Sequence, residues 1–508
     1  MKPSPRSLVI FLIFLNMQAF FSQNVNREFR GVWIATVKNI DWPQKADSTS
    51  IQQKEALIQM LDFFKKMNFN ALIFQIRPAA DAFYHSEYEP WSVWLTDSIG
   101  SKPSPYFDPL AFIIKEAHKR GMELHAWLNP YRAVVGYKDE MKNGFQLLKE
   151  KPDWFIKYGN NLYFNPGIPE VRAYTNKVVA DILQKYDVDA IHFDDYFYPY
   201  KIDNEDFNDD DAFKEFGAAY YPDRIEDWRR NNVNLLIHEL HNTIKNIKPW
   251  VQFGISPFGV WRNKSKDPSG SDTNASQTNY DDLYADVILW LENNWIDYIV
   301  PQAYWEIGFE PADYRKVVDW WNEHSYGVNL YIGQAMYRQS QMTKEAWQQQ
   351  DPTEIERQLD YNHTKSEVHG TVYFSAKSFR ANTFGVNDLL KQKYYKLPAL
   401  PPVLFENHSE SPSAVSGIVI SKVKRRIYSL SWQPEPEDAE KKAVKYLIYQ
   451  FGKNEKTDAG NPEKLIAITG ETHYDLDRKS LKKAPVFIIV PVNRSNKTGA
   501  IEVFRYRE

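Results

Sequence analysis

The feature that most constrains this chain is a repeated alternation of short apolar segments with longer amphipathic ones, from Arg30 to Tyr395. Short apolar runs are typical of buried strands, and apolar residues at helical spacing are typical of helices that cover a sheet. The strands are expected at 31–37, 71–77, 123–129, 190–195, 252–256, 298–304, 329–334 and 370–375. Eight strand–helix units predict an α/β fold in which a parallel sheet closes into a (β/α)8 barrel, a TIM barrel, over residues 27–396.

Local signals support this arrangement. Asp108 and Pro109 are the residues expected at a helix cap and first helical position, and Gly121 is expected to end that helix. An open, doubly wound sheet is the alternative. It is less favoured because no glycine-rich phosphate loop follows the first strand.

The pattern changes after a proline-rich break, for which we assign residues 397–412 as a linker. Residues 413–508 carry short alternating strands between polar turns, which predicts a small all-β, immunoglobulin-like sandwich. Segments 429–432, 446–449 and 487–493 resemble strands of a fibronectin type III module. We expect this part to be a spacer or a docking module for an envelope protein or a glycan.

The beginning of the chain predicts export. Lys2 and Arg6 precede an apolar run over 8–21, which is typical of a secretory signal peptide, here 1–22, and too short for a confident membrane span. An uncleaved anchor is the alternative. From this segment we expect the protein to be exported and periplasmic or envelope-associated. The chain has no cysteine, so neither disulfides nor a lipid-modified cysteine are expected. A net charge of −4 gives no electrostatic reason to expect nucleic acid as a partner.

The most informative stretch runs from Ala190 to Tyr200, where two adjacent carboxylates end a strand and aromatic residues follow. Strand alternation directs Ile191 and Phe193 to the helices, and His192 and Asp194 to the barrel interior. Burying an unpaired carboxylate is costly, so Asp194 and Asp195 indicate the floor of a cleft. The alternative is that one aspartate caps the next segment while the other forms a salt bridge.

Polar residues also recur at the carboxyl ends of other strands, where the active sites of such barrels lie. Strand phase places the following side chains there: Gln75, Arg77, His125, Trp127, Asn129, His192, Asp194, Gln302, Tyr304, Glu306, Ser375 and Lys377. This concentration at one end predicts a catalytic mouth.

Three carboxylates at this end, Asp194, Asp195 and Glu306, suit glycosidic-bond cleavage, which needs a proton donor and a nucleophile or base. We expect Asp194 to be the nucleophile or base and Glu306 the proton donor. Because adjacent carboxylates repel, one of the pair Asp194 and Asp195 could instead keep its proton and act as the acid. For an N-acetylated sugar, the substrate's acetamide could attack while Asp195 orients it.

The remaining polar groups are expected to bind sugar hydroxyls or hold the carboxylates ionised. The residues predicted to bind substrate are Arg77, Trp127, Asn129, His192, Gln302, Tyr304, Trp305 and Lys377, with Trp261 as a further stacking platform. Structural alternatives are a core histidine for His192, an ion-pair partner for Arg77, and packing for each tryptophan. No cofactor or metal site is expected; the acidic run 203–211 lacks the ligand spacing of a calcium loop.

These motifs together resemble the glycosyl-hydrolase-like 10 family of bacterial envelope proteins. The residues that carry the resemblance are Arg27–Val37, Asp41–Pro43, Phe74–Pro78, His125–Pro130, His192–Tyr196 and Pro301–Tyr304. The resemblance implies a glycosidase-type barrel that acts on the glycan strands of peptidoglycan. The alternatives are a non-catalytic glycan-binding protein on the same scaffold and hydrolysis through a bound metal.

Overall fold

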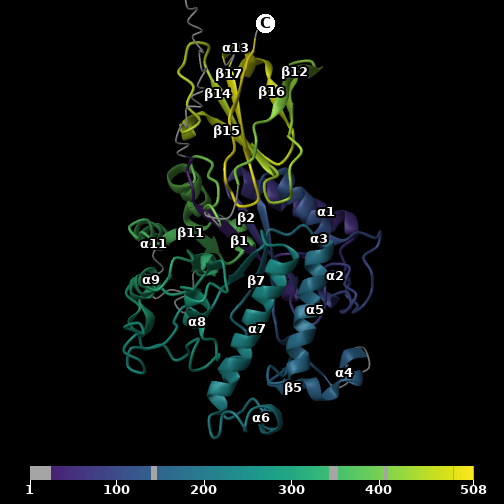
Figure 1. The fold of residues 1–508 in the computed structure, drawn as a ribbon, viewed down its shortest axis with the longest axis vertical. Coiled ribbons are helices and arrows are strands. Elements are labelled where there is room, and N and C mark those ends of the chain that lie inside the picture. Colours follow the sequence, from purple (N-terminus) through teal and green to yellow (C-terminus); the bar gives the residue numbers. More distant parts are fainter. Residues whose placement is uncertain (1–24, 139–145, 342–352, 405–409, 484–485, 507–508) are drawn as a thin grey trace, which may run out of the picture.

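The computed structural model describes residues 25–138, 146–341, 353–404, 410–483 and 486–506. Eight parallel strands form a closed barrel in the order β1-β11-β10-β9-β8-β7-β3-β2, which confirms the predicted barrel (Figure 1). Their bounds are β1 Phe29–Ile34, β2 Ala71–Arg77, β3 Glu123–Leu128, β7 Ala190–Phe193, β8 Gln252–Ile255, β9 Tyr298–Ile299, β10 Asn329–Gln334 and β11 Val368–Tyr373.

Helices surround the barrel and begin at the caps that the sequence encodes. Thr49 forms a capping box with Gln52 at the start of the first helix, and Asp108 accepts the Ala111 N–H ahead of Pro109. The main helices are α1 Ser50–Lys66, α3 Pro109–Lys119, α5 Pro169–Lys185, α7 Ile225–Ile247, α8 Val287–Glu292, α9 Tyr314–Glu323 and α11 Glu354–Asn362. Shorter ones are α2 Val93–Thr96, α4 Gln146–Glu150, α6 Asp210–Phe216, α10 Met336–Gln341, α12 Val386–Leu389 and α13 Arg478–Lys483.

The sixth barrel strand differs from its prediction. Residues 298–304 were expected to be extended, but β9 ends at Ile299. Pro301 has no N–H to donate to a ladder, and pairing resumes only as isolated bridges from Gln302 to Phe258 and Gly333. Strand alternation therefore does not fix the direction of side chains beyond Ile299, including that of Glu306.

The carboxyl ends of the strands carry structure that the sequence did not predict. The connection from β3 to α5 contains a small antiparallel sheet, ordered β4-β6-β5, with β4 Arg132–Val134, β5 Phe155–Tyr158 and β6 Asn161–Phe164. In Figure 1, β5, α4 and α6 lie at the end of the barrel away from the C-terminal β-strands. These insertions mark the mouth of the barrel.

The C-terminal part is a sandwich of two antiparallel sheets, as predicted. The sheets are ordered β12-β13-β16 and β15-β14-β17-β18. Leu430 and Trp432 of one sheet share a buried cluster with Ile448, Phe487 and Ile489 of the other. The strands are β12 Ser416–Lys424, β13 Ile427–Gln433, β14 Lys445–Phe451, β15 Leu465–Thr469, β16 His473–Asp477, β17 Val486–Val492 and β18 Glu502–Arg505.

The sandwich is attached to the floor of the barrel, at the amino ends of the strands. Lys445 Nζ lies 3.2 Å from Oε1 of Glu123, the first residue of β3, and both side chains are buried. The same oxygen accepts a 2.9 Å hydrogen bond from Asn496 Nδ2. Arg494 pairs with Asp187 at 2.7 Å. The two domains therefore share a buried, charge-paired interface.

Part of the predicted linker belongs to this interface. Arg30 and Asn70 of the barrel donate hydrogen bonds to the carbonyls of Leu397 and Ala399, at 2.7 and 3.1 Å. Leu400 packs in the apolar cluster of the four-stranded sheet. The predicted signal peptide, 1–22, lies outside the described residues. Among the residues that the structure describes, no helix is long and apolar enough to cross a membrane.

Candidate active site

Asp194 follows the last residue of β7 and is held by neutral hydrogen-bond donors from β3. Trp127 Nε1 donates to Oδ2 at 3.0 Å, and Asn129 Nδ2 donates to both carboxylate oxygens at 3.0 and 3.2 Å. Burial raises the pKa of Asp194, while the charge of Arg132 and these donors act in the opposite direction. The site thus brings together three residues that the sequence predicted.

Asp195 turns toward a different set of neighbours. Its Oδ2 accepts a very short hydrogen bond from the Tyr200 hydroxyl, and the Gln302 side chain also donates to it. Burial and the charge of Asp194 raise the pKa of Asp195 to about 7. Adjacent in sequence, the two carboxyls therefore differ: Asp194 has several donors and a nearby cation, and Asp195 retains a proton near neutral pH.

His192 lies inside the barrel rather than on an open surface. Its Nδ1 lies 2.9 Å from the Tyr298 hydroxyl and its Nε2 lies 3.0 Å from Ser256 Oγ. Burial, with a smaller effect of the neighbouring His125, holds the pKa of His192 well below its usual value. The side chain is fully buried and both ring nitrogens are hydrogen-bonded, which is the environment that the core-histidine alternative expects, and substrate binding by His192 stays a prediction.

A chain of hydrogen bonds links this histidine to the floor of the barrel. Trp33 Nε1 can only donate, and it lies 3.3 Å from His192 Nε2, so the proton of His192 is on Nδ1 and faces Tyr298. The Tyr298 hydroxyl then donates to His125 Nδ1 at 2.7 Å. The proton of His125 is consequently on Nε2, which lies 3.1 Å from Glu123. Every ring nitrogen of the two histidines thus has a partner.

The upper end of this chain approaches the carboxylates. Gln302, which donates to Asp195, also donates from Nε2 to the backbone carbonyl of Ser256 at 2.9 Å. Ser256 is the residue after β8, and its hydroxyl contacts His192. Buried polar groups therefore run from the sandwich interface at Lys445 to the mouth at Asp195.

Other predicted residues have different surroundings. Arg77 forms a buried ion pair with Glu89 at 2.6 Å and is 1% exposed, which is the environment that the ion-pair alternative expects. Lys377 is exposed, and its backbone N–H donates to Asp41 Oδ1 at 2.6 Å. Trp261 is buried and stacks on Trp320 with ring centroids 5.5 Å apart, so it is a packing residue.

The segment with Glu306 lies in the connection after β9. Glu306 is half-buried, and the next residue, Ile307, donates its N–H to Glu354 of α11 at 2.8 Å. Trp305 is half-buried and packs against Phe258, 5.4 Å between ring centroids. Tyr304 is half-buried beside Phe374 of the mouth. Asp194 and Asp195 therefore have hydrogen-bond partners at the strand ends, whereas the neighbours of Glu306 in sequence, Trp305 and Ile307, contact α11.

Three further residues contact or influence the strand ends and were not predicted from the sequence. Tyr200 donates to Asp195, Arg132 acts on Asp194, and Asp41 joins the ends of β1 and β11. Asp41 accepts the Ala35 N–H at 2.7 Å and the Ser375 hydroxyl at 2.8 Å, and burial raises its pKa to about 6. Tyr200 was visible in the aromatic run after Asp195, but its contact depends on loop geometry.

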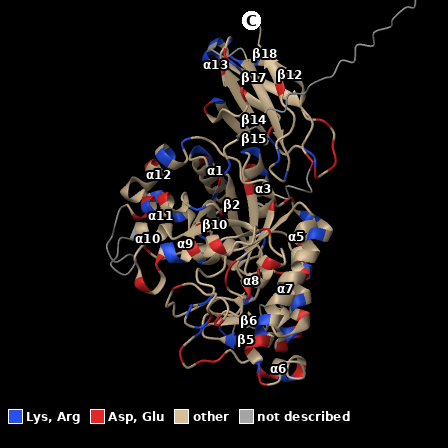
Figure 2. Cartoon of the chain, turned by 60° about the vertical axis from the view of Figure 1, so that its left-hand side comes forward, with Lys and Arg blue, Asp and Glu red and all other residues tan. Residues whose placement is uncertain are grey.

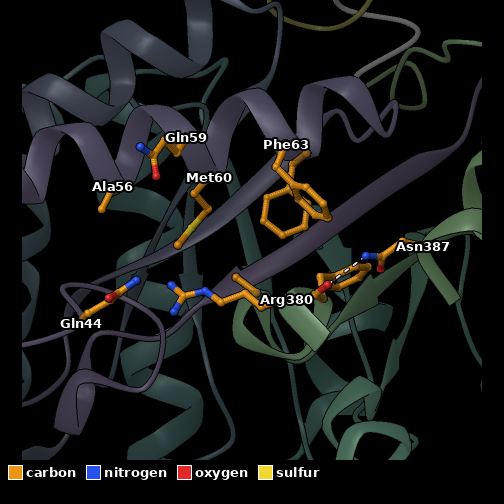
Figure 3. A pocket seen from close by; sticks show the side chains of 10 residues that line it. Gln44, Ala56, Gln59, Met60, Phe63, Arg380 and Asn387 are labelled. Carbon is orange, nitrogen blue, oxygen red and sulfur yellow. Dashed lines mark hydrogen bonds between the residues drawn. The ribbon is translucent and has the colours of Figure 1, made fainter. Parts of the chain in front are cut away.

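Two surface hollows of the described chain lie away from these carboxylates. One, of about 340 Å³, lies between α1 and the chain after β11; Met60 and Phe63 face Arg380 across it (Figure 3). The other, of about 1110 Å³, lies at the floor of the barrel beside the sandwich and is lined by His241, Trp250 and others. Neither contains Asp194 or Asp195.

The chain is similar to known glycosyl hydrolases over most of its length. The "Glycosyl hydrolase YngK" of Bacillus subtilis is 42% identical over 485 residues, which is 93% of this chain and 92% of that protein. The "Glycosyl hydrolase DigH" of Escherichia coli is 38% identical over 374 residues, 70% of this chain and 84% of that protein.

Solved structures are more distant. The PgaB (BpsB) glycoside hydrolase domain from Bordetella bronchiseptica has 13% identity and a TM-score of 0.46, covering 72% of this chain and 98% of that one. The family model "Glycosyl hydrolase-like 10" matches residues 28–351. The chain belongs to the glycosyl hydrolase-like 10 family.

Proposed function

We propose that this chain is an exported glycosidase that cleaves glycan strands of peptidoglycan, with Asp195 as proton donor and Asp194 as the ionised carboxylate. The observation that carries the proposal is the pair of buried, adjacent carboxyls with different environments. A carboxyl with a pKa of about 7 is suited to donate a proton near neutral pH.

The chemistry follows from the two environments. The Asp195 carboxyl proton passes to the glycosidic oxygen while the bond from that oxygen to the anomeric carbon breaks. The Asp194 carboxylate stabilises the positive charge that develops on the sugar ring. In an N-acetylated sugar, the acetamide oxygen is placed to attack when its N–H is bound by a carboxylate, and the hydrogen bonds to Asp194 favour that residue for this role over Asp195. Water then completes hydrolysis and Asp195 regains a proton.

Two elements of the proposal have separate support. The envelope location rests on the basic and apolar beginning of the chain, and the peptidoglycan substrate on the resemblance of the motifs. The roles of Asn129, Trp127, Gln302 and Tyr304 are to hold the carboxyls and to line the mouth.

Digestion of purified peptidoglycan and defined glycan fragments, followed by mass spectrometry, tests the function. The wild type should release glycan fragments, and Asp195→Asn should lower the rate by about 10³-fold or more. Glu306→Gln is the control, because Glu306 is the alternative proton donor. The cleavage rate of this variant should be less than tenfold below that of the wild type. A greater loss for Glu306→Gln than for Asp195→Asn would return the acid role to Glu306. Tight binding without cleavage by the wild type would favour the glycan-binding alternative.

A further inference from the structure

The far end of the sandwich carries a dense group of cationic side chains that the glycosidase chemistry does not use. The hairpin between β12 and β13 and the short helix α13 contribute seven exposed residues, which we call the basic tip. They are Lys422, Lys424, Arg425, Arg426, Arg478, Lys479 and Lys482.

The two segments of the basic tip are joined. Ile427 pairs with Asp477, and the Arg478 N–H donates to the Arg426 carbonyl at 3.1 Å, so α13 begins where the hairpin ends. Figure 2 shows blue residues at α13, beside the ends of the sandwich strands. The tip is one surface rather than two separate basic segments.

The charges of the basic tip are largely uncompensated. Within the described part of the chain, no ion pair includes any of the seven residues. Asp477, an acidic residue within the basic tip, accepts the N–H and the hydroxyl of Ser480 at 2.7 and 2.8 Å, and these hydrogen bonds lower its pKa, with a smaller effect of the Lys479 charge. Since the whole chain has a net charge of −4, this concentration of positive charge is local. Such a patch attracts anionic surfaces.

Apolar side chains accompany the charges. Val423, between two lysines of β12, is 59% exposed, and Val419 on the same strand is 53% exposed. An anionic polymer in water gains nothing from exposed valines, whereas the interface of a bilayer accepts them among basic residues. This combination favours a membrane over a soluble polyanion.

We propose that the basic tip binds a membrane surface that contains anionic phospholipid. Because the sandwich is fixed to the barrel floor through Lys445 and Glu123, and the carboxylates lie at the opposite end of the barrel, binding directs the mouth away from the bilayer (Figure 1). The enzyme then acts on polymer that lies above the membrane. The proposal does not depend on the identity of that polymer.

Sedimentation of the full chain with vesicles tests this binding. One set of vesicles contains phosphatidylcholine with one quarter phosphatidylglycerol, and the other contains phosphatidylcholine alone. The wild type should bind the anionic vesicles, and binding should weaken steeply as salt rises from 0.05 to 0.5 M because the Debye length shortens. Binding to neutral vesicles should be at least tenfold weaker.

Variants locate the surface. Lys424→Gln/Arg425→Gln/Arg426→Asn removes three charges, with asparagine at residue 426 because its φ of 68° suits that residue. Each lost charge should weaken binding about fivefold, so the triple variant should bind about a hundredfold more weakly. The matched control, Lys102→Gln/Lys115→Gln/Lys177→Gln, removes three exposed barrel charges and should bind like the wild type.

Two further outcomes decide the partner. Val419→Thr/Val423→Thr should weaken vesicle binding several-fold and leave any binding to soluble polyphosphate unchanged. Equal binding of the triple variant and its control would overturn the proposal. So would binding of polyphosphate without binding of anionic vesicles, which would assign the surface to a soluble polyanion.

Discussion

Carboxylates are buried at both the mouth and the floor of the barrel, but their pKa values are shifted in opposite directions. At the floor, burial opposes ionisation, but the charge of Lys445 and the hydrogen bond from His125 hold the pKa of Glu123 below its usual value. The pKa of Asp189, also at the floor, is likewise lowered, because this carboxylate pairs with His118 at 2.7 Å. At the mouth, burial and the charge of Asp194 raise the pKa of Asp195 to about 7.

The difference lies in the partners rather than in the burial. Among the described residues, no salt bridge includes Asp194 or Asp195, and their hydrogen-bond donors include tryptophan, asparagine, tyrosine and glutamine side chains. Neutral donors satisfy oxygen atoms without fully compensating the charge. We therefore expect a buried carboxylate in a salt bridge to be structural, and a buried carboxyl whose direct hydrogen-bond donors are neutral, as for Asp195, to be suited to proton transfer.

The largest expected effect, on kcat, comes from neutralising one carboxylate at the mouth, and neutralising one at the floor is its control. Asp194→Asn should lower kcat by about 10³-fold, because the variant no longer offsets the charge that develops on the sugar. Its free energy of unfolding should be unchanged or higher, since an ionised group that burial disfavours is gone. Glycan release and chemical denaturation measure the two quantities.

The floor carboxylate supplies the matched control. Glu123→Gln should keep kcat within tenfold of the wild type but lower the free energy of unfolding, because Lys445 loses its partner. If Glu123→Gln abolished cleavage at a temperature where it is folded, the division between a catalytic and a structural end would be wrong.

The second prediction concerns the cation at the floor. Lys445→Met should lower the free energy of unfolding by about 3–5 kcal/mol, because it leaves the Glu123 carboxylate buried with hydrogen bonds but no cation. Lys442→Met is the control: this lysine is exposed, and its replacement should change stability by no more than about 0.5 kcal/mol. Guanidinium denaturation followed by circular dichroism measures both.

A double variant sharpens this result. Glu123→Gln/Lys445→Met removes both charges and should recover part of the lost stability, since no ion is then left unpaired. A double variant that is as unstable as the sum of the single variants would show that the two groups act independently.

The third prediction uses pH. Asp195 titrates at about 7 in the folded chain against an ordinary value of 3.8, so between these values the folded chain holds a proton that the unfolded chain has lost. Its contribution to stability is present below pH 3.8 and is lost as the pH rises through 7. From pH 5 to pH 8, the wild type should lose about 2–3 kcal/mol relative to Asp195→Asn. A constant difference between the two proteins would contradict the raised pKa.

The sequence predicted the barrel well because each strand is a short apolar run between amphipathic helices, one of which begins at the cap formed by Asp108 ahead of Pro109. Contacts at the strand ends were also predictable where the strands are regular, because Trp127 and Asn129 donate hydrogen bonds to Asp194. Strand alternation no longer predicts side-chain direction after Pro301, which interrupts the ladder. The direction of the Glu306 side chain could therefore not be predicted. The floor could not be predicted either, because the pairing of Glu123 with Lys445 joins residues from two domains far apart in the sequence.

The smallest expected effect comes from removing the Tyr298 hydroxyl, which links His192 on the mouth side to His125 on the floor side. Tyr298 accepts from His192 and donates to His125, and its ring packs inside the barrel beside Phe29 and Tyr331. Tyr298→Phe keeps the ring and removes the hydroxyl, leaving one buried imidazole N–H and one imidazole nitrogen without partners.

Losing those two contacts should cost about 1–3 kcal/mol of the free energy of unfolding, within the range for leaving a buried donor unsatisfied. The more telling measurement is the pH dependence of kcat/KM. Because Gln302 connects Asp195 to Ser256 through a backbone carbonyl, a disturbance at His192 reaches the carboxyl only through packing, and the alkaline limit near pH 7 should shift by less than half a unit. A shift of a full unit or more would mean that the floor sets the acidity of the mouth, and the two ends would then have to be treated as one titrating system rather than two.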